Sequence, residues 1–103
     1  MAKNLILSRV SASDVLKKNQ IEDLTANLEE SAMVLLEDGV IGINSAQFPY
    51  EKLEDQKIPI FCLIEDLEAR GFIPDEIKAN IKMINYDDLI DLIDKSDRII
   101  SWL

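Results

Sequence analysis

Side chains that could carry out covalent chemistry are few in this chain. Histidine is absent and cysteine occurs once, at Cys62. This composition excludes histidine-based catalytic triads, histidine-containing zinc sites, Cys-x-x-Cys redox pairs and an internal disulfide bond. Cys62 is the only available sulfur nucleophile, but it lies in the apolar run Ile60–Ile64. A buried, inert cysteine is the usual outcome there, because reactive thiols need partial exposure and a nearby positive group or helix N-terminus.

Acidic and polar residues follow each of the first four predicted strands. Parallel strands place their carboxyl ends at one edge of a sheet, so this edge would present four carboxylates, one guanidinium and a phenol that could bind a metal or a basic partner. Alternatively, Asp38 and Asp66 cap the helices that follow them. The residues at the strand ends are Ser8-Arg9, Glu37-Asp38-Gly39, Glu65-Asp66 and Asn85-Tyr86. The candidate rim or interface residues are Asp38, Gly39, Glu65, Asp66, Arg70 and Trp102.

Two further patterns could indicate ligand sites. Asp87, Asp88, Asp91 and Asp94 occur at helical spacing, but an exposed helix face diverges whereas a divalent ion needs converging oxygen ligands. We interpret them as solvated charges. The three glycines form no Gly-x-Gly or Walker-type loop, which excludes the usual phosphate-binding loops. We therefore predict no metal and no cofactor.

Charge and hydropathy limit the class of protein further. Twenty acidic residues against 11 basic ones give a formal net charge of −9, which disfavours direct binding to a nucleic acid backbone. The longest apolar run, Ile58–Ile64, is far shorter than the roughly 20 residues of a membrane-spanning helix. The first residues lack the apolar stretch of a signal peptide, so we expect a cytoplasmic protein without membrane contact.

Strands and helices are predicted to alternate along the chain. Asn4–Val10, Met33–Leu36, Ile58–Ile64, Ile81–Ile84 and Arg98–Trp102 have the composition of strands. Helices or helical turns are predicted from Ser11 to about Glu30, at Val40–Ser45, Tyr50–Gln56, Glu65–Arg70 and Pro74–Glu76, and after Asn85. Gly71 would end the fourth of these in a left-handed cap. In the last helix, the spacing predicts an apolar face of Tyr86, Leu89, Ile90 and Ile93.

Alternation of this kind predicts a three-layer α/β/α sandwich with a mainly parallel sheet of about five strands. A length of 103 residues suits one domain over residues 1–103. Trp102, after two isoleucines, is either a lid on the core or an interface anchor.

The sequence segments that link these elements resemble those of the DsrH/TusB family. The resemblance rests on the order and spacing of four segments and covers about Met33 to Trp102. Those segments are Leu35–Val40, Ile64–Gly71, Ile84–Asp88 and Trp102. It implies a small α/β subunit of a cytosolic sulfur-relay complex that also contains DsrE/TusD-like and DsrF/TusC-like subunits. In such complexes, sulfur is generally received on a cysteine of the DsrE/TusD-like subunit and passed to a separate carrier protein.

Within that family, the resemblance leaves two branches open. In the TusB branch the relayed sulfur goes to 2-thiouridine at the wobble position of transfer RNAs, and in the DsrH branch the complex serves sulfur oxidation. Some DsrH-like members carry a cysteine in the early helix, but Ser13–Gln20 contains none here. This favours a non-catalytic interaction subunit. The alternatives are a persulfide carrier that uses Cys62 and a stand-alone homo-oligomer that binds a ligand or regulates a partner.

Overall fold

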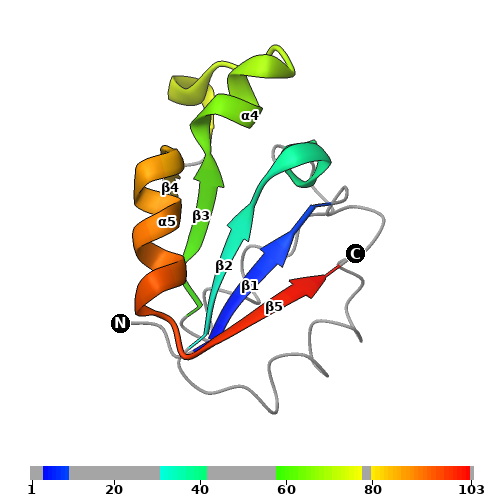
Figure 1. Ribbon diagram of the computed structural model, residues 1–103. Helices are drawn as coiled ribbons and strands as arrows, with labels where there is room; N and C mark the ends of the chain where they lie inside the picture. The colour runs from blue at the N-terminus through cyan, green and yellow to red at the C-terminus, as the bar shows by residue number, and fades with distance from the viewer. Residues whose placement is uncertain (1–3, 10–30, 42–57, 78–79, 103) are drawn as a thin grey trace.

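A computed structural model describes residues 4–9, 31–41, 58–77 and 80–102 of the chain (Figure 1). Five strands form one sheet in the order β4-β3-β2-β1-β5, and each neighbouring pair is parallel. The strands are β1 (Asn4–Ser8), β2 (Ser31–Leu35), β3 (Ile60–Leu63), β4 (Ile81–Ile84) and β5 (Arg98–Trp102). The predicted α/β fold with a mainly parallel sheet of about five strands is confirmed.

Composition explains which strands are central. All five residues of β2 are buried, as expected for a parallel strand covered on both faces. β4 and β5 lie at the two edges of the sheet, and each has exposed side chains, including Lys82 and Arg98. Pro59 precedes β3, where its carbonyl oxygen accepts a hydrogen bond from Met33 at 2.9 Å. Because Pro59 lies before the first residue of β3, its missing N–H removes no hydrogen bond from the β3 ladder.

Two α-helices follow β3 and β4. The first, α4 (Ile64–Ala69), begins directly after β3, one residue earlier than predicted. It ends as predicted, because Gly71 has a φ of 82°. The amides of Gly71 and Phe72 donate to the carbonyl oxygens of Glu68 and Leu67, the pairing of a Schellman cap.

The second helix, α5 (Tyr86–Lys95), begins at the cap that the sequence predicts. The Asn85 side chain accepts a hydrogen bond from the Asp88 amide at 2.9 Å, and the Asp88 carboxylate accepts one from the Asn85 amide at 3.2 Å. This capping box satisfies two N–H groups that the helix leaves without internal partners.

Two short 3₁₀ helices complete the described elements. The first, η1 (Glu37–Val40), follows β2, and the second, η2 (Pro74–Glu76), begins at a proline as predicted. The helix predicted at Val40–Ser45 is wrong where it can be compared, since Val40 ends η1 and Ile41 is a turn. Glu37-Asp38-Gly39 instead forms most of η1, a helical turn that is four residues long.

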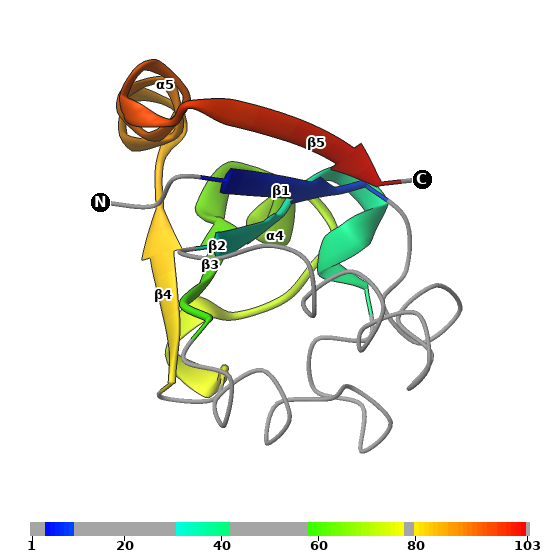
Figure 2. The same cartoon turned by 90° about the horizontal axis from the view of Figure 1, so that it is seen from below.

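The sheet has an apolar cluster on each face. Leu89 and Leu92 of α5 pack against one face, whose buried residues include Leu5, Val34 and Leu63. Leu67 of α4 joins the other cluster, which contains Ile6, Met33, Leu35, Ile60 and Cys62. Figure 2 shows α5 to one side of the sheet. The described helices therefore contribute to both faces, as the three-layer prediction requires.

The apolar face predicted for α5 is only partly buried. Leu89 is 7% exposed, but Tyr86, Ile90 and Ile93 are exposed, and Leu92 contributes to the core instead. Leu89 and Leu92 are neighbours at i and i+3, so the helix is rotated away from the predicted stripe. Consequently, one flank of α5 carries exposed apolar side chains.

Several predicted elements lie outside the described residues. These are the helix from Ser11 to about Glu30, the helical turn at Tyr50–Gln56 and most of Val40–Ser45. Within the ranges that the structure describes, it has no helix that is long and apolar enough to cross a membrane.

Candidate functional site at the strand ends

The carboxyl ends of the strands converge as predicted. Ser8, the last residue of β1, pairs in register with Leu35 of β2 and Trp102 of β5. Glu37 and Asp38 follow β2, Glu65 and Asp66 follow β3, and Asn85 follows β4. The backbone of Trp102 therefore lies at the same edge as the acidic residues, which we call the acidic rim: Glu37, Asp38, Glu65 and Asp66.

Asp66, which lies in α4, connects this helix to η1 and to α5. Its Oδ2 accepts a hydrogen bond from the Glu37 amide at 2.6 Å, and its Oδ1 accepts one from the Tyr86 hydroxyl at 3.3 Å. No side chain caps α4 itself. The prediction that Asp66 caps its own helix is therefore wrong: Asp66 binds the first amide of η1 instead.

Glu65 does the same for the other neighbouring helix. Its Oε2 accepts a hydrogen bond at 3.2 Å from the amide of Tyr86, the first residue of α5. Adjacent carboxylates at the start of α4 thus bind the first amides of η1 and α5. Both helices leave these N–H groups without intrahelical partners, and a carboxylate is favoured at this end of the helix dipole.

Asp38 pairs with Arg70 at the far end of α4. The Nε and Nη2 atoms of Arg70 both donate to Oδ1 of Asp38, at 3.1 and 3.0 Å, and Nη1 donates to the Asp66 carbonyl oxygen at 3.2 Å. Asp38 itself lies within η1, and the residue before η1, Leu36, provides no side-chain cap. The helix that Asp38 was predicted to cap, Val40–Ser45, lies mostly outside the described residues. Asp38 is an exposed ion-pair partner that connects η1 to α4.

Gly39 is needed for close approach between η1 and β1. A Cβ atom at this position would lie 2.0 Å from the Ser8 carbonyl oxygen. The same oxygen accepts a hydrogen bond from the Leu36 amide at 3.1 Å. Glu37 has a φ of 51°, an unfavourable conformation for a residue other than glycine, and its amide is held by Asp66. The turn after β2 is therefore fixed by contacts with β1 and α4.

Three side-chain atoms near the rim are buried without a hydrogen bond to any described residue. They are Ser8 Oγ, Arg9 Nε and Glu65 Oε1. Ser8 is fully buried, whereas Arg9 and Glu65 are partly exposed.

The charges and hydrogen bonds of the rim raise the pKa of the Tyr86 phenol. The negative charge of Asp66 is the main cause, followed by partial desolvation, the hydrogen bond to Asp66 and the charge of Glu65. Arg70 acts in the opposite direction. The phenol therefore stays protonated and serves as a hydrogen-bond donor.

The rim carboxylates mostly bind backbone amides and side chains of neighbouring elements. Among the described residues, no three His, Cys, Asp or Glu side chains converge as a metal site would require. The four aspartates of α5 are all exposed, in agreement with the solvated-charge interpretation, and Asp88 belongs to the capping box. The hydrogen bonds and the ion pair at this edge therefore hold η1, α4 and α5 in place at the ends of the strands.

Cys62 lies away from the rim inside the sheet. It pairs in register with Leu35 and Met83, has no exposed surface and belongs to the cluster on the face opposite α5. Burial, with a smaller contribution from Asp66, raises its pKa to about 12. The side chain is therefore a protonated thiol at neutral pH.

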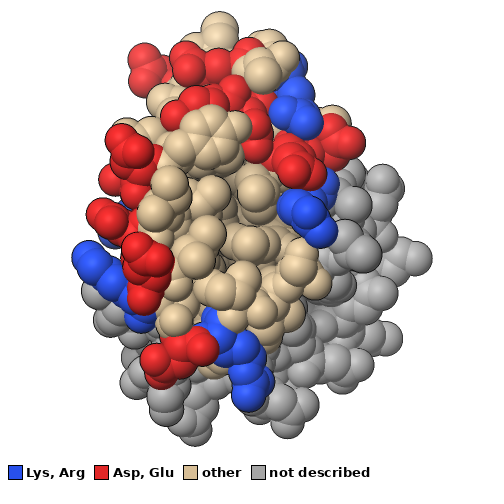
Figure 3. Space-filling model, viewed as in Figure 1, with Lys and Arg blue, Asp and Glu red and all other residues tan. Residues whose placement is uncertain are grey.

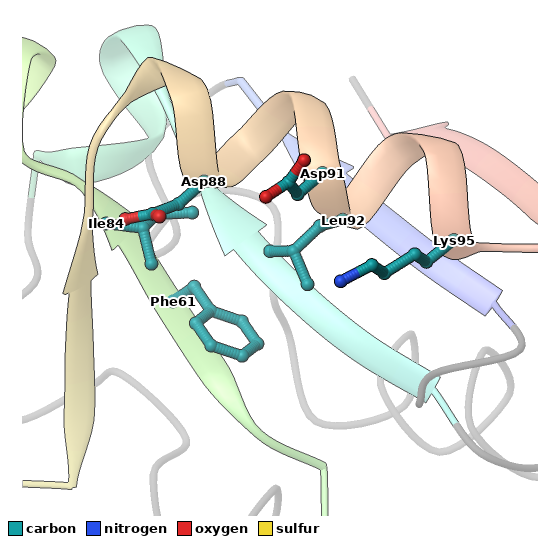
Figure 4. A pocket seen from close by; sticks show the side chains of 6 residues that line it. All are labelled: Phe61, Ile84, Asp88, Asp91, Leu92 and Lys95. Atoms are coloured by element: carbon teal, nitrogen blue, oxygen red, sulfur yellow. The ribbon is translucent and has the colours of Figure 1, made fainter.

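A pocket beside α5 was not predicted from the sequence (Figure 4). It has a volume of about 210 Å³, and it is lined by Phe61, Ile84, Asp88, Asp91, Leu92 and Lys95. Apolar side chains from β3 and β4 face Leu92, while Asp88, Asp91 and Lys95 come from the flank of α5 above them. The helical spacing of residues 88, 91, 92 and 95 was the available signal.

Comparison with known sequences identifies relatives over most of the chain. Residues 13–99 match the family described as DsrH like protein. A protein named TusB from Erwinia tasmaniensis is 34% identical over 70 residues, which are 68% of this chain and 73% of the relative. TusB of Salmonella dublin is 33% identical over 75 residues, 72% of this chain and 77% of its own.

Solved structures share the fold at low sequence identity. The YchN protein from E. coli superimposes with a TM-score of 0.71 at 15% identity, over 99% of this chain and 100% of that chain. Protein Tm0979 from Thermotoga maritima gives a TM-score of 0.54 at 21% identity, over 87% and 91% of the two chains. These similarities establish the fold.

Proposed function

This chain belongs to the DsrH family, and we propose that it is a non-catalytic interaction subunit of a cytoplasmic sulfur-relay complex. The family match over residues 13–99 is the observation that carries the proposal. The partners would be DsrE/TusD-like and DsrF/TusC-like subunits, with a separate sulfur-carrier protein downstream.

The state of Cys62 supports a non-catalytic role. In persulfide transfer, a thiolate of the acceptor attacks the outer sulfur of the donor persulfide. A new S–S bond forms, the donor S–S bond breaks, and the donor leaves as a thiolate. An acceptor therefore needs an accessible, ionised thiol. Cys62 is fully buried, with a pKa of about 12, and supplies neither property.

The arrangement of the rim also supports a structural subunit. Glu65, Asp66 and Arg70 each form hydrogen bonds with a neighbouring element. A rim that fixes helix positions presents a rigid surface to other proteins. Preorganisation of this kind lowers the entropic cost of binding another protein.

Within the family, we favour 2-thiolation of the transfer RNA wobble uridine as the destination of the sulfur. The relatives with 33–34% identity carry the name TusB. The formal charge of −9 suits a subunit that leaves RNA contact to a downstream enzyme.

Co-expression tests the assembly. The tagged chain is produced with the two sister subunits of its host, purified, and analysed by size-exclusion chromatography with light scattering. We expect one complex that contains all three chains in fixed proportion. A tagged chain that elutes by itself under these conditions would contradict the proposal.

A deletion strain tests the destination and the role of the thiol. Transfer RNA nucleosides are analysed by mass spectrometry in cells that lack the gene and in cells complemented with the wild type or with Cys62→Ala. We expect 2-thiouridine to be lost on deletion and restored by both forms. Failure of a folded Cys62→Ala protein to restore it would support a persulfide on Cys62, and unchanged 2-thiouridine on deletion would exclude the thiolation branch.

A further inference from the structure

One side of the molecule presents exposed apolar side chains from two elements. Tyr86, Ile90 and Ile93 on α5 are 49%, 55% and 36% exposed, and Ile99 on β5 is 41% exposed. Leu7 on β1 is partly buried and packs against the core cluster beneath α5. We refer to these five residues as the apolar face.

Register and helix geometry place these residues on the same side of the sheet. Ile99 pairs with Leu5, which belongs to the cluster that α5 covers, and paired residues of parallel strands point to the same face. The flank of α5 with Asp88, Asp91 and Lys95 borders the pocket over β3 and β4. Residues 86, 90 and 93 lie on the opposite flank.

The figures agree with this placement. In Figure 1, α5 lies in front of the β4 side of the sheet and leaves β1 and β5 without a described helix in front of them. Figure 3 shows, from the same direction, a broad uncharged area in the centre of the molecule, with acidic groups above and to the left and basic groups to the right and below. A large exposed apolar area commonly marks a protein interface.

Negative charges border the apolar face on its α5 side. On α5, Asp87 lies three residues before Ile90 and Asp94 lies four residues after it, so both are its neighbours on the helix surface. Tyr86 contacts Asp66 and Glu65 of the acidic rim. A second copy of this chain would bring the same acids, whereas a partner with basic residues around an apolar centre would be complementary.

We infer that the apolar face binds a different protein chain, whose contact surface is apolar at its centre and carries Lys or Arg where it meets α5. The inference rests on the proposed function, and within it the partner is one of the two sister subunits. Ile90 and Ile99 supply the apolar contacts, and Asp87 and Asp94 guide the approach of the basic border.

Matched isoleucine variants test the apolar part. Ile90→Gln is compared with Ile73→Gln, because both isoleucines are 55% exposed but Ile73 precedes η2, outside the apolar face. Affinity for the co-purified sister subunits is measured by titration calorimetry or interferometry. We expect Ile90→Gln to weaken binding by about tenfold or more and Ile73→Gln to change it by less than about twofold. Ile99→Gln serves as a second variant, and thermal unfolding verifies that each protein is folded.

Salt and charge variants test the border. Raising the salt concentration, or introducing Asp87→Asn together with Asp94→Asn, should slow association by about threefold or more and change dissociation less. Full affinity in folded Ile90→Gln and Ile99→Gln proteins would overturn the assigned surface. An association rate insensitive to salt would overturn the basic border.

The failure of the proposed function would look different. If the wild-type chain did not bind the sister subunits, both the relay proposal and this choice of partner would fall. A dimer of the chain alone that Ile90→Gln dissociates would show that the apolar face binds a second copy, which also overturns the inference.

Discussion

The carboxylate of Asp66 accepts a hydrogen bond from the amide of Glu37 at 2.6 Å, although the two residues are 29 positions apart in the sequence. Together with the bond from Tyr86, it connects η1, α4 and α5 at the carboxyl ends of the strands. Predictions about the rim follow from this connection.

Asp66→Ala should destabilise the protein by about 1–2 kcal/mol, because the Glu37 amide loses the side chain that caps η1 and the Tyr86 hydroxyl loses its acceptor. Urea unfolding followed by circular dichroism measures the change. Glu68→Ala, an exposed change on the same helix, should alter the free energy of unfolding by less than about 0.5 kcal/mol. Equal effects of the two substitutions would contradict the capping role.

Gly39→Ala should be the more harmful of two glycine substitutions. The new Cβ would lie 2.0 Å from the Ser8 carbonyl oxygen, so η1 must move away from β1, and we expect a loss of about 2–3 kcal/mol. At Gly71→Ala a Cβ would meet no atom within 4 Å, and only the φ of 82° is unfavourable, which costs about 1 kcal/mol. Denaturant unfolding of both variants gives the order, and a smaller loss at Gly39 would refute the close approach.

The Tyr86 phenol should ionise above the ordinary tyrosine range, because Asp66 raises its pKa. Absorbance at alkaline pH follows tyrosinate formation, and Tyr86→Phe isolates the contribution of Tyr50. Asp66→Asn removes the main negative charge, so the pKa of Tyr86 should fall toward its usual value. An unchanged titration in Asp66→Asn would show that Asp66 does not control the phenol.

The Cys62 thiol should react with a disulfide reagent at least about 100-fold more slowly in the native protein than after denaturation, because it is buried and protonated. Rates with and without denaturant measure this protection. Native reactivity equal to that of the denatured chain would show an accessible thiol and reopen the persulfide-carrier alternative.

Cys62 should also contribute to alkaline instability. Its folded pKa of about 12 lies above the ordinary thiol value of 9.0, so its contribution is fully present below about pH 9. As the pH rises from about 9 to about 12, the unfolded thiol loses its proton first, and stability falls by up to about 1.4 kcal/mol per pH unit. Cys62→Ala should show a shallower decline, since other groups titrate equally in both proteins. Identical slopes would contradict the raised pKa.

Elements specified by nearby residues were predictable from the sequence. The cap at Asn85, the left-handed glycine at 71 and the apolar strand Ile81–Ile84 depend on residues within a few positions of one another, and the structure has all three. The convergence of the strand ends was also predictable, because alternating strands and helices require parallel pairing.

The residues of the candidate site could be predicted from the sequence, but the hydrogen bonds that they form could not. The acids after β2 and β3 were expected to meet, either to bind a metal or a basic partner or, for Asp38 and Asp66, to cap the following helices. The capping prediction for Asp66 failed because capping preference describes one helix at a time, whereas Glu65 and Asp66 bind amides 21 and 29 residues away. No local pattern specifies which neighbouring helix a carboxylate will reach.

By itself, the sequence determined the alternation of elements, the lack of histidine and of a second cysteine, and membership of the family. The tertiary structure alone decided the strand order β4-β3-β2-β1-β5, the rotation that exposes Ile90 and buries Leu89, and the fit of Gly39 against Ser8. The physical reason is range: propensities and caps act within about one helical turn, whereas sheet order and helix rotation come from packing between segments far apart in the chain.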